Sequence, residues 1–322
     1  MKTYKGQATN LRNTILGKVT KSPKGIFKRK DYILVSEDPK TNLWGYRGIL
    51  TSGSDFERFS SKKPPIVTSL PIDQLAGLNE EDIVLLDPNG EVKVIWDSES
   101  ISNAIFTTDR CNCSCIMCPQ HKLNTCFEEH ELNLKLLNLI DPKKTRHIGI
   151  TGGEPTLLNE KLFELIKICR NKFPDISLSL LTNGRKFKEL SFAKKIAEIN
   201  HPNLIICISL NADTDTEHDY IMGASGSFNE TVEGLYNLAL LRQKVEIRTV
   251  IHSFNYKRLP KLAEFIYHNF PFVVHVALMG MEVTGLSLEN IETLWVDPYD
   301  YLNELREAVL YLDRRLINVS VY

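Results

Sequence analysis

The chain lacks the features by which membrane and secreted proteins are recognised. Its 322 residues contain no apolar run that approaches the roughly 18 residues a membrane-spanning helix needs. The first thirty residues are too polar for a secretory signal, and we find no internal repeat or low-complexity segment. These absences predict a cytoplasmic protein. In a reducing compartment its seven cysteines are expected to be thiols or metal ligands rather than disulfides.

Acidic residues are absent from the first thirty residues, although the whole chain has a net charge of only -1. A basic segment of this kind can attract an acidic partner, but a solvated surface is the simpler explanation. Few aromatic residues accompany the charges, so we do not expect nucleic acid to stack there.

Short β-type runs dominate the first third of the chain. They cover residues 32–35, 48–52, 83–86 and 92–96, and the last two are joined by the turn sequence Asp87-Pro88-Asn89-Gly90. Residues 53–71 are predicted to form a loop, because they are rich in serine and proline. We therefore predict a small β-rich domain over residues 1–100, which is a candidate for substrate or partner recognition.

Strands and helices alternate from residue 104 onward. Six strands are predicted, at residues 104–108, 148–151, 176–182, 204–210, 245–251 and 273–278, and another strand-like run covers 317–321. The predicted helices include one with Phe228, Val232, Leu235 and Ala239 on its apolar face. Because a complete eight-unit barrel needs about 250 residues, residues 101–322 are predicted to form an α/β domain, a partial TIM-like (β/α)6 parallel barrel.

Three cysteines follow the first predicted strand with the spacing C-x3-C-x2-C, at Cys111, Cys115 and Cys118. Three soft thiolates on one loop suit a four-iron cluster in which one iron keeps an open coordination position. Taken alone, the same spacing also suits a zinc site.

A second motif, Gly152-Gly153-Glu154-Pro155, follows the next predicted strand. The two glycines allow a close backbone approach to a ligand, and the proline break directs carbonyl groups toward an ammonium group. A tight turn without a ligand is the structural alternative. Since parallel barrels carry their sites at the carboxyl ends of the strands, this turn and the cysteine loop are expected to lie close together.

The two motifs together resemble the radical S-adenosylmethionine (SAM) superfamily. The resemblance implies that Cys111, Cys115 and Cys118 ligate a 4Fe-4S cluster and that the turn at 152–155 receives the methionine end of SAM. It further implies an electron donor protein, because a one-electron reduction starts SAM cleavage to a 5′-deoxyadenosyl radical.

Further SAM contacts are predicted at the ends of the next strands. They are Met117, which stands where many superfamily members have an aromatic residue near the adenine, and Thr182, Asn183, Ser209, Asn211 and Arg248. Ser209 and Asn211 are candidates to bind the carboxylate or ribose, and Arg248 to pair with the carboxylate. Strand capping and a structural ion pair are the alternatives. No side chain is predicted to act as a general acid or base.

The remaining cysteines and two histidines are predicted to have no role as ligands. Cys169 and Cys207 lie in apolar surroundings and are expected to be small buried hydrophobic residues. Cys113 and Cys126 flank the cysteine loop and are expected to be bystanders. His121 and His147 are expected to be polar or core histidines.

Longer segments resemble the radical SAM maturase of the His-Xaa-Ser system, in its C-type member. They are NAIFTTDRCN at 103–112, CPQ at 118–120, VEIRTVIH at 245–252, HVALMGMEVTG at 275–285 and LWVDP at 294–298. Members of that family continue with a cysteine-containing tail, which we expect to be missing after Tyr322.

This second resemblance implies an enzyme that modifies a ribosomally made peptide or small protein carrying His-Xaa-Ser repeats, together with a second radical SAM maturase. Two other functions remain open. The first is a radical SAM enzyme acting on RNA, which the basic first segment favours and the lack of an RNA-binding motif disfavours. The second is a scaffold without catalytic activity that binds zinc.

Overall fold

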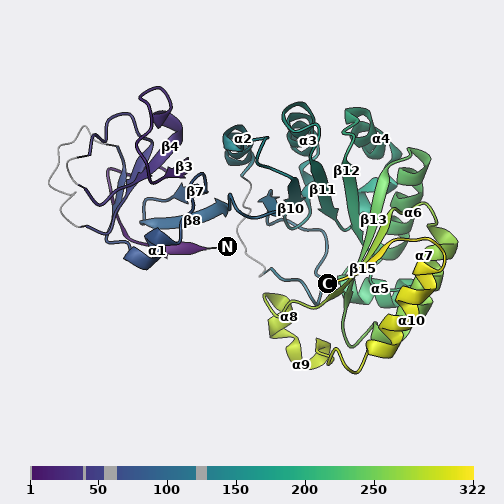
Figure 1. Cartoon of the computed structure of the whole chain (residues 1–322). Helices are drawn as coiled ribbons and strands as arrows, with labels where there is room; N and C mark the ends of the chain where they lie inside the picture. Colours follow the sequence, from purple (N-terminus) through teal and green to yellow (C-terminus); the bar gives the residue numbers. More distant parts are fainter. Residues whose placement is uncertain (1, 39–40, 54–63, 121–128) are drawn as a thin grey trace. The chain divides into compact units, whose positions relative to one another are not determined.

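The computed structural model of the chain describes residues 2–38, 41–53, 64–120 and 129–322 (Figure 1). The chain forms two compact units, and each is described by itself. The first comprises Met1–Ala104 and Glu131–Arg146, and the second comprises Ile105–His130 and His147–Tyr322. None of the helices in the described ranges is long and apolar enough to cross a membrane.

The first unit contains a mixed sheet of eight strands in the order β1-β8-β7-β3-β4-β5-β6-β2. The strands are β1 (Thr3–Lys5), β2 (Gln7–Thr9), β3 (Ile15–Thr20), β4 (Tyr32–Val35), β5 (Gly48–Leu50), β6 (Ile66–Thr68), β7 (Ile83–Leu86) and β8 (Glu91–Trp96), and the connections carry η1 (Arg29–Asp31) and α1 (Ile72–Ala76). The expected β-rich region is confirmed. Strand β6 corrects the loop predicted over 53–71: its three residues are all buried, but the run is too short to show alternation.

The basic first segment is partly neutralised within its own unit. Lys18 lies 3.0 Å from the Glu81 carboxylate, and Lys24 lies 2.7 Å from that of Glu80. Tyr32 also donates to Glu81, at 2.7 Å. Strand β3, which the sequence did not reveal, carries Lys18, and Lys24 lies between β3 and η1.

The eight-stranded sheet closes on itself at Gly6. Strands β1 and β2 stand at opposite ends of the strand order, yet Gly6 alone separates them in the chain. A Cβ atom at Gly6 would lie 2.4 Å from the Thr68 carbonyl oxygen and 2.7 Å from Val67 Cγ1. The Gly6 amide donates to the Gly90 carbonyl at 2.9 Å, which joins this corner to the β7–β8 turn.

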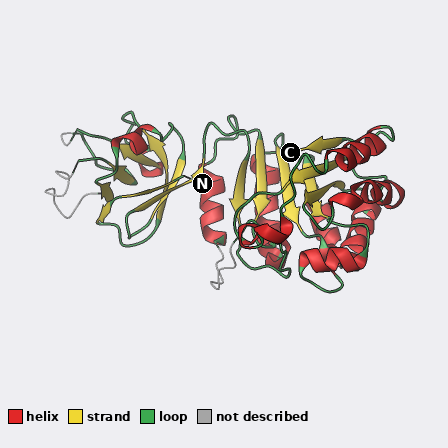
Figure 2. Cartoon of the chain, turned by 90° about the horizontal axis from the view of Figure 1, so that it is seen from below, coloured by secondary structure: helices red, strands yellow, loops and turns green. Residues whose placement is uncertain are grey.

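The second unit contains seven parallel strands in sequential order, with helices on the outer face of the curved sheet (Figures 1 and 2). The strands are β9 (Asn103–Phe106), β10 (His147–Thr151), β11 (Ser177–Thr182), β12 (Leu204–Ser209), β13 (Lys244–Ile251), β14 (His275–Gly280) and β15 (Val319–Val321). The predicted partial barrel is confirmed. It has one more strand than the six expected, because β15 pairs in parallel with β14.

The helices of the chain after β9 are α2 (His130–Leu139), α3 (Glu160–Lys172), α4 (Leu190–Ile199), α5 (Asp215–Met222), α6 (Ser227–Leu240), α7 (Leu259–Asn269), α8 (Leu286–Glu289), α9 (Ile291–Leu294) and α10 (Leu302–Asp313), with 3-10 turns η3 (Pro155–Leu158), η4 (Arg185–Lys188) and η5 (Tyr256–Arg258). The buried face of α6 differs from the predicted one. It contains Thr231, Gly234, Leu235 and Leu238. The helix turns this face inward because Gly234 packs directly against the backbone of Gly184: a Cβ at Gly234 would lie only 2.6 Å from the Gly184 carbonyl oxygen.

Alternation along the strands separates the core from the barrel interior. In β13, Val245, Ile247 and Ile251 are buried, whereas Glu246 and Arg248 are half-buried on the opposite face. Since side chains of a strand point alternately to its two faces, the apolar set packs under the helices and the polar set faces the interior.

We expect the replacement Gly6→Ala to destabilise the first unit by about 1–3 kcal/mol, because the added methyl group overlaps the backbone of β6. Gly25→Ala is the matched control, since a Cβ at Gly25 meets no atom within 4 Å. Urea denaturation of both variants measures the difference. Equal stability of the two variants would show that the corner tolerates a side chain.

Two core histidines predict a loss of stability at low pH. Burial lowers the pKa of His218 and of His252 to about 4, and each Nδ1 accepts a backbone N–H bond. Between pH 6.5 and 4 the unfolded chain binds protons that the folded chain does not, so the free energy of unfolding should fall as the pH falls through this window. The double variant His218→Asn/His252→Asn, which keeps an acceptor at each position, should flatten this slope. Replacement of the exposed His268 by Asn should leave it unchanged.

Candidate functional site

A cavity of about 290 Å³ lies at the carboxyl ends of the strands of the second unit. Thr151, Thr182 and Ser209, the last residues of β10, β11 and β12, form part of its lining. Ten of the thirteen predicted site residues line it: Cys111, Cys115, Met117, Cys118, Gly152, Gly153, Thr182, Asn183, Ser209 and Arg248. The structure therefore places most of the predicted site in one cavity.

The second half of the cysteine loop is held by backbone hydrogen bonds to α5 and α8. The amides of Ser114 and Ile116 donate to the carbonyls of Met222 and Ile221, at 2.9 and 3.0 Å. The Cys118 carbonyl accepts from the amide of Leu286 at 2.9 Å. These bonds fix the backbone around Cys115 and Cys118 and leave their side chains partly exposed toward the cavity.

The sulfur atoms of the loop lie close enough together to affect one another's ionisation. A hydrogen bond between the thiols of Cys111 and Cys113 raises the pKa of Cys111. The same bond lowers the pKa of Cys113, but a bond to Cys115 and burial outweigh it and raise that pKa to about 12. The Cys111 thiol is therefore protonated at neutral pH and must release its proton when it ligates a metal.

The glycines of the turn after β10 are required by packing against the start of the cysteine loop. A Cβ at Gly152 would lie 2.6 Å from the Thr108 carbonyl oxygen, and one at Gly153 would lie 2.3 Å from that of Arg110. The Gly153 amide donates to Thr108 at 2.6 Å, and the Glu154 amide donates to Arg110 at 2.8 Å. The tight turn that we gave as the structural alternative is therefore present, and its residues Gly152 and Gly153 also form part of the cavity wall.

Glu154 and Pro155 lie behind this wall. The Glu154 side chain is 1% exposed and accepts bonds from the hydroxyls of Thr156 and Thr182, at 2.6 and 2.7 Å, and from the amides of Thr156 and Asn183, at 3.0 and 2.7 Å. Burial raises the pKa of Glu154, and the four donors act against this shift. Pro155 is buried as the first residue of η3. The side chain of Glu154 is therefore a connector between the β10 and β11 turns.

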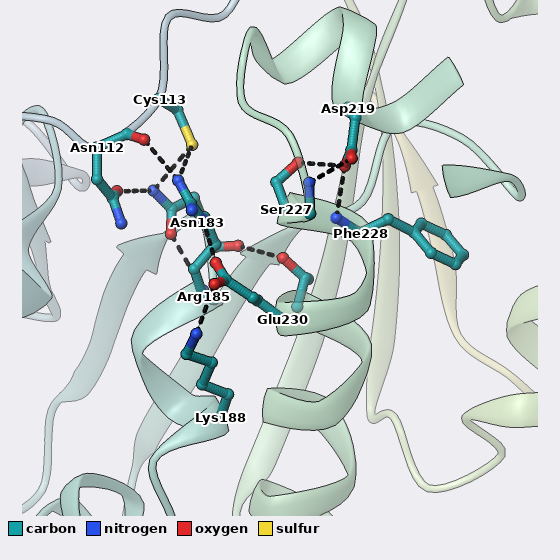
Figure 3. A network of polar contacts seen from close by, with 12 residues as sticks. Asn112, Cys113, Asn183, Arg185, Lys188, Asp219, Ser227, Phe228 and Glu230 are labelled. Atoms are coloured by element: carbon teal, nitrogen blue, oxygen red, sulfur yellow. Dashed lines mark hydrogen bonds and ion pairs between the residues drawn. The ribbon is translucent and has the colours of Figure 1, made fainter. Parts of the chain in front are cut away.

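Asn183 reaches from the β11 turn to the first half of the cysteine loop. Its Nδ2 donates to Asn112 Oδ1 at 2.7 Å and to Cys113 Sγ at 3.4 Å, while its Oδ1 accepts from the Arg185 amide at 3.1 Å (Figure 3). The neighbouring Thr182 hydroxyl is directed to Glu154. Both residues line the cavity, but their side-chain hydrogen bonds are already made within the protein.

Arg248 combines a place in the cavity lining with the ion pair that we considered as its structural alternative. Its Nε donates to Glu246 Oε1 at 2.6 Å. The other oxygen of Glu246 lies 2.8 Å from His275 Nδ1, and His275 Nε2 lies 2.9 Å from the Ser320 hydroxyl. This network fixes the guanidinium on the interior face of β13, beside Ser209 of the neighbouring strand β12.

Asn211 lies outside the cavity lining. It is 1% exposed, its Oδ1 accepts from the Val250 amide at 3.1 Å, and its Nδ2 faces Met222 Sδ at 3.4 Å. This position agrees with strand capping, which we gave as the structural alternative for Asn211.

Cys113 and Cys207 also line the cavity, although the sequence pattern pointed to other roles. Burial raises the pKa of Cys207 to about 12, which agrees with the expected buried thiol. Cys207 and Ser209 are two residues apart on one strand, so their side chains point to the same face of the sheet. This spacing is the one signal in the sequence that Cys207 lies on the cavity side. His147 lies 3.0 Å from the Ser179 hydroxyl, as a polar interior residue. Cys126 and His121 lie outside the described residues.

The donors present fit an iron–sulfur cluster better than a single ion. Three thiols of one loop line the same cavity, and they would supply the three protein ligands of a cluster with one open iron. Among the described residues, no three His, Cys, Asp or Glu side chains converge as the ligands of a single metal ion would.

The replacement Glu154→Gln should destabilise the protein by about 1–3 kcal/mol, because an amide NH2 would face one of the four buried donors. Glu160→Gln is the control: it removes the same charge from an exposed pair with Lys195 and should change stability by less than about 0.5 kcal/mol. Urea denaturation of the cluster-free proteins measures both. Similar losses in the two variants would refute the connecting role of Glu154.

Comparison with known sequences places this site in a family. The profile of the radical SAM superfamily matches residues 105–266, which is half of the chain. A GTP 3',8-cyclase of Petrotoga mobilis is 29% identical over 214 residues, which cover 64% of this chain and 62% of that protein. A 7,8-dihydro-6-hydroxymethylpterin dimethyltransferase of Methanocaldococcus jannaschii is 32% identical over 155 residues, 46% of this chain and 27% of that protein. The chain thus spans less than two thirds of these curated relatives.

Solved structures share the fold at low sequence identity. Streptococcus suis SuiB bound to SAM matches with a TM-score of 0.57 and 17% identity, over 70% of this chain and 50% of that one. The enzyme anSMEcpe with bound SAM matches with a TM-score of 0.53 and 18% identity, over 68% and 64%. With the superfamily profile, the cysteine spacing and the cavity in agreement, the chain belongs to the radical SAM superfamily, and its cofactors are a 4Fe-4S cluster and SAM.

Proposed function

We propose that the chain cleaves SAM reductively in order to modify a ribosomally made peptide or small protein of the His-Xaa-Ser repeat type. The cavity lining carries this proposal. Among its described residues, Arg248 is the single cation and Asp109 the single carboxylate. A nucleoside triphosphate would need several arginines or lysines around its phosphates, whereas a peptide side chain does not.

Cyclisation of GTP is the second candidate, because several sequence relatives are named GTP 3',8-cyclase. The low positive charge of the lining disfavours it. The solved structure of SuiB with its precursor peptide SuiA has the same fold, with a TM-score of 0.55 at 15% identity, and so shows that the fold is compatible with a peptide substrate.

Cys111, Cys115 and Cys118 would hold the cluster. The backbone of Gly152 and Gly153 would receive the methionine end of SAM, with Ser209 and Arg248 at its carboxylate and Met117 beside the adenine. Glu154, Pro155 and Asn211 would act from behind the cavity wall, by fixing the turns that present these groups.

The cofactor pair, when bound and reduced, supplies a 5′-deoxyadenosyl radical that removes a hydrogen atom from the substrate. The protein's part is to orient both molecules and to exclude water. Met222, Val250, Met279 and Leu286 give the cavity an apolar wall suited to this exclusion. An electron donor protein and a second radical SAM maturase complete the proposed system.

The test is anaerobic reconstitution followed by SAM, dithionite and a candidate small protein with His-Xaa-Ser repeats. We expect about four irons per chain, 5′-deoxyadenosine and a mass change in the candidate protein. Cys115→Ala should lose the brown chromophore and SAM cleavage together. Cys169→Ala, which removes a fully buried thiol of α3, should keep both.

Parallel reactions with GTP and with RNA distinguish the alternatives. A cyclised product from GTP, or a modified nucleotide in RNA, would contradict the peptide proposal. Tightly bound zinc without SAM cleavage would contradict an enzymatic role altogether. A Cys115→Ala protein that kept its chromophore would refute the ligand assignment.

A further inference from the structure

The first half of the cysteine loop is held from a different element than the second half. Arg185, the first residue of η4, points its guanidinium at the two residues that follow Cys111 (Figure 3). Its Nη1 donates to the Asn112 carbonyl at 2.5 Å and lies 3.7 Å from Cys113 Sγ. The backbone hydrogen bonds from the loop to α5 and α8 begin at Ser114.

Arg185 is itself fixed from three directions. Its Nε donates to Glu230 Oε2 on α6 at 2.5 Å, and its amide donates to Asn183 Oδ1. The preceding Gly184 has a φ of +82°, and a Cβ there would lie 2.8 Å from Ile208. Only 15% of the Arg185 side chain is exposed. A long side chain with so little freedom presents its charge at a defined place.

The helix that carries Glu230 is also anchored. Asp219 of α5 accepts bonds from the amides of Gly226 and Phe228, at 2.5 and 2.8 Å, and from the Ser227 hydroxyl at 2.8 Å, at the start of α6 (Figure 3). Lys188 is a second partner of Glu230, at 2.5 Å, and Figure 3 shows its ammonium group directed at that carboxylate rather than at the loop. Arg185 and Lys188 thus pair with the same Glu230 carboxylate, and Arg185 in addition donates a hydrogen bond to the cysteine loop.

We propose that Arg185 is a positioning residue for the cluster, which holds the Cys111 half of the loop and makes reduction of the cluster easier. A cluster becomes more negative when it accepts an electron, and a fixed cation beside its ligand loop stabilises that state. Donors near the sulfurs act in the same direction. The inference rests on the superfamily's cluster and does not depend on which substrate is modified.

The experiment is an EPR-monitored redox titration of the reconstituted holoenzyme, with iron and sulfide measured per chain. For Arg185→Gln we expect the reduction equilibrium to become about tenfold less favourable, a shift of about 59 mV to more negative potential for one electron. The iron content should also fall, because the loop loses an anchor. Lys188→Gln removes the same charge from the same carboxylate without touching the loop, and it should keep the iron content and a potential near that of the wild type.

Glu230→Gln provides a test with the opposite sign, which remains available if Arg185→Gln fails to fold. It keeps the guanidinium and removes a nearby negative charge, so the potential should rise. Wild-type potential and iron content in Arg185→Gln, or equal shifts in Arg185→Gln and Lys188→Gln, would overturn the proposal. Both readouts are independent of any peptide, so a failed substrate assay would leave this result intact.

Discussion

The close backbone approach between the β10 turn and the start of the cysteine loop is the constraint on which the site depends. Gly152 and Gly153 lie so near the carbonyls of Thr108 and Arg110 that no side chain fits at either position. The amides of Gly153 and Glu154 bond to those carbonyls. The cavity wall is therefore continuous from the loop that carries the thiols to the turn proposed to receive SAM.

A buried carboxylate extends this wall to the next strand. Glu154 takes hydrogen bonds from both its own turn and the β11 turn, so the ends of β10 and β11 are held together by one side chain. A buried charged group is stable only when its acceptors are satisfied, and four donors meet this requirement. Glu154 carries the carboxylate of the turn at 152–155, and this carboxylate joins two turns of the protein.

The two halves of the cysteine loop are held by different groups. Backbone bonds from α5 and α8 fix the part from Ser114 onward, whereas side chains of the β11 turn hold Asn112 and Cys113. A substitution can remove a side-chain anchor, whereas the backbone anchors do not depend on the identity of a side chain. The hold on Asn112 and Cys113 is therefore the part of the loop's support that a single substitution can change.

The sequence by itself determined the partial barrel, the β-rich first unit and the neighbourhood of the cysteine loop and the β10 turn, because strand periodicity and motif spacing are local. It missed β3 and the three-residue strands β1, β2 and β6, which pair with strands far away in the sequence. Only the tertiary structure placed Asn211 and Glu154 behind the cavity and Arg185 beside Cys113. The reason is that a polar side chain chooses its hydrogen-bond partner among residues dozens of positions away, and no local pattern records that choice.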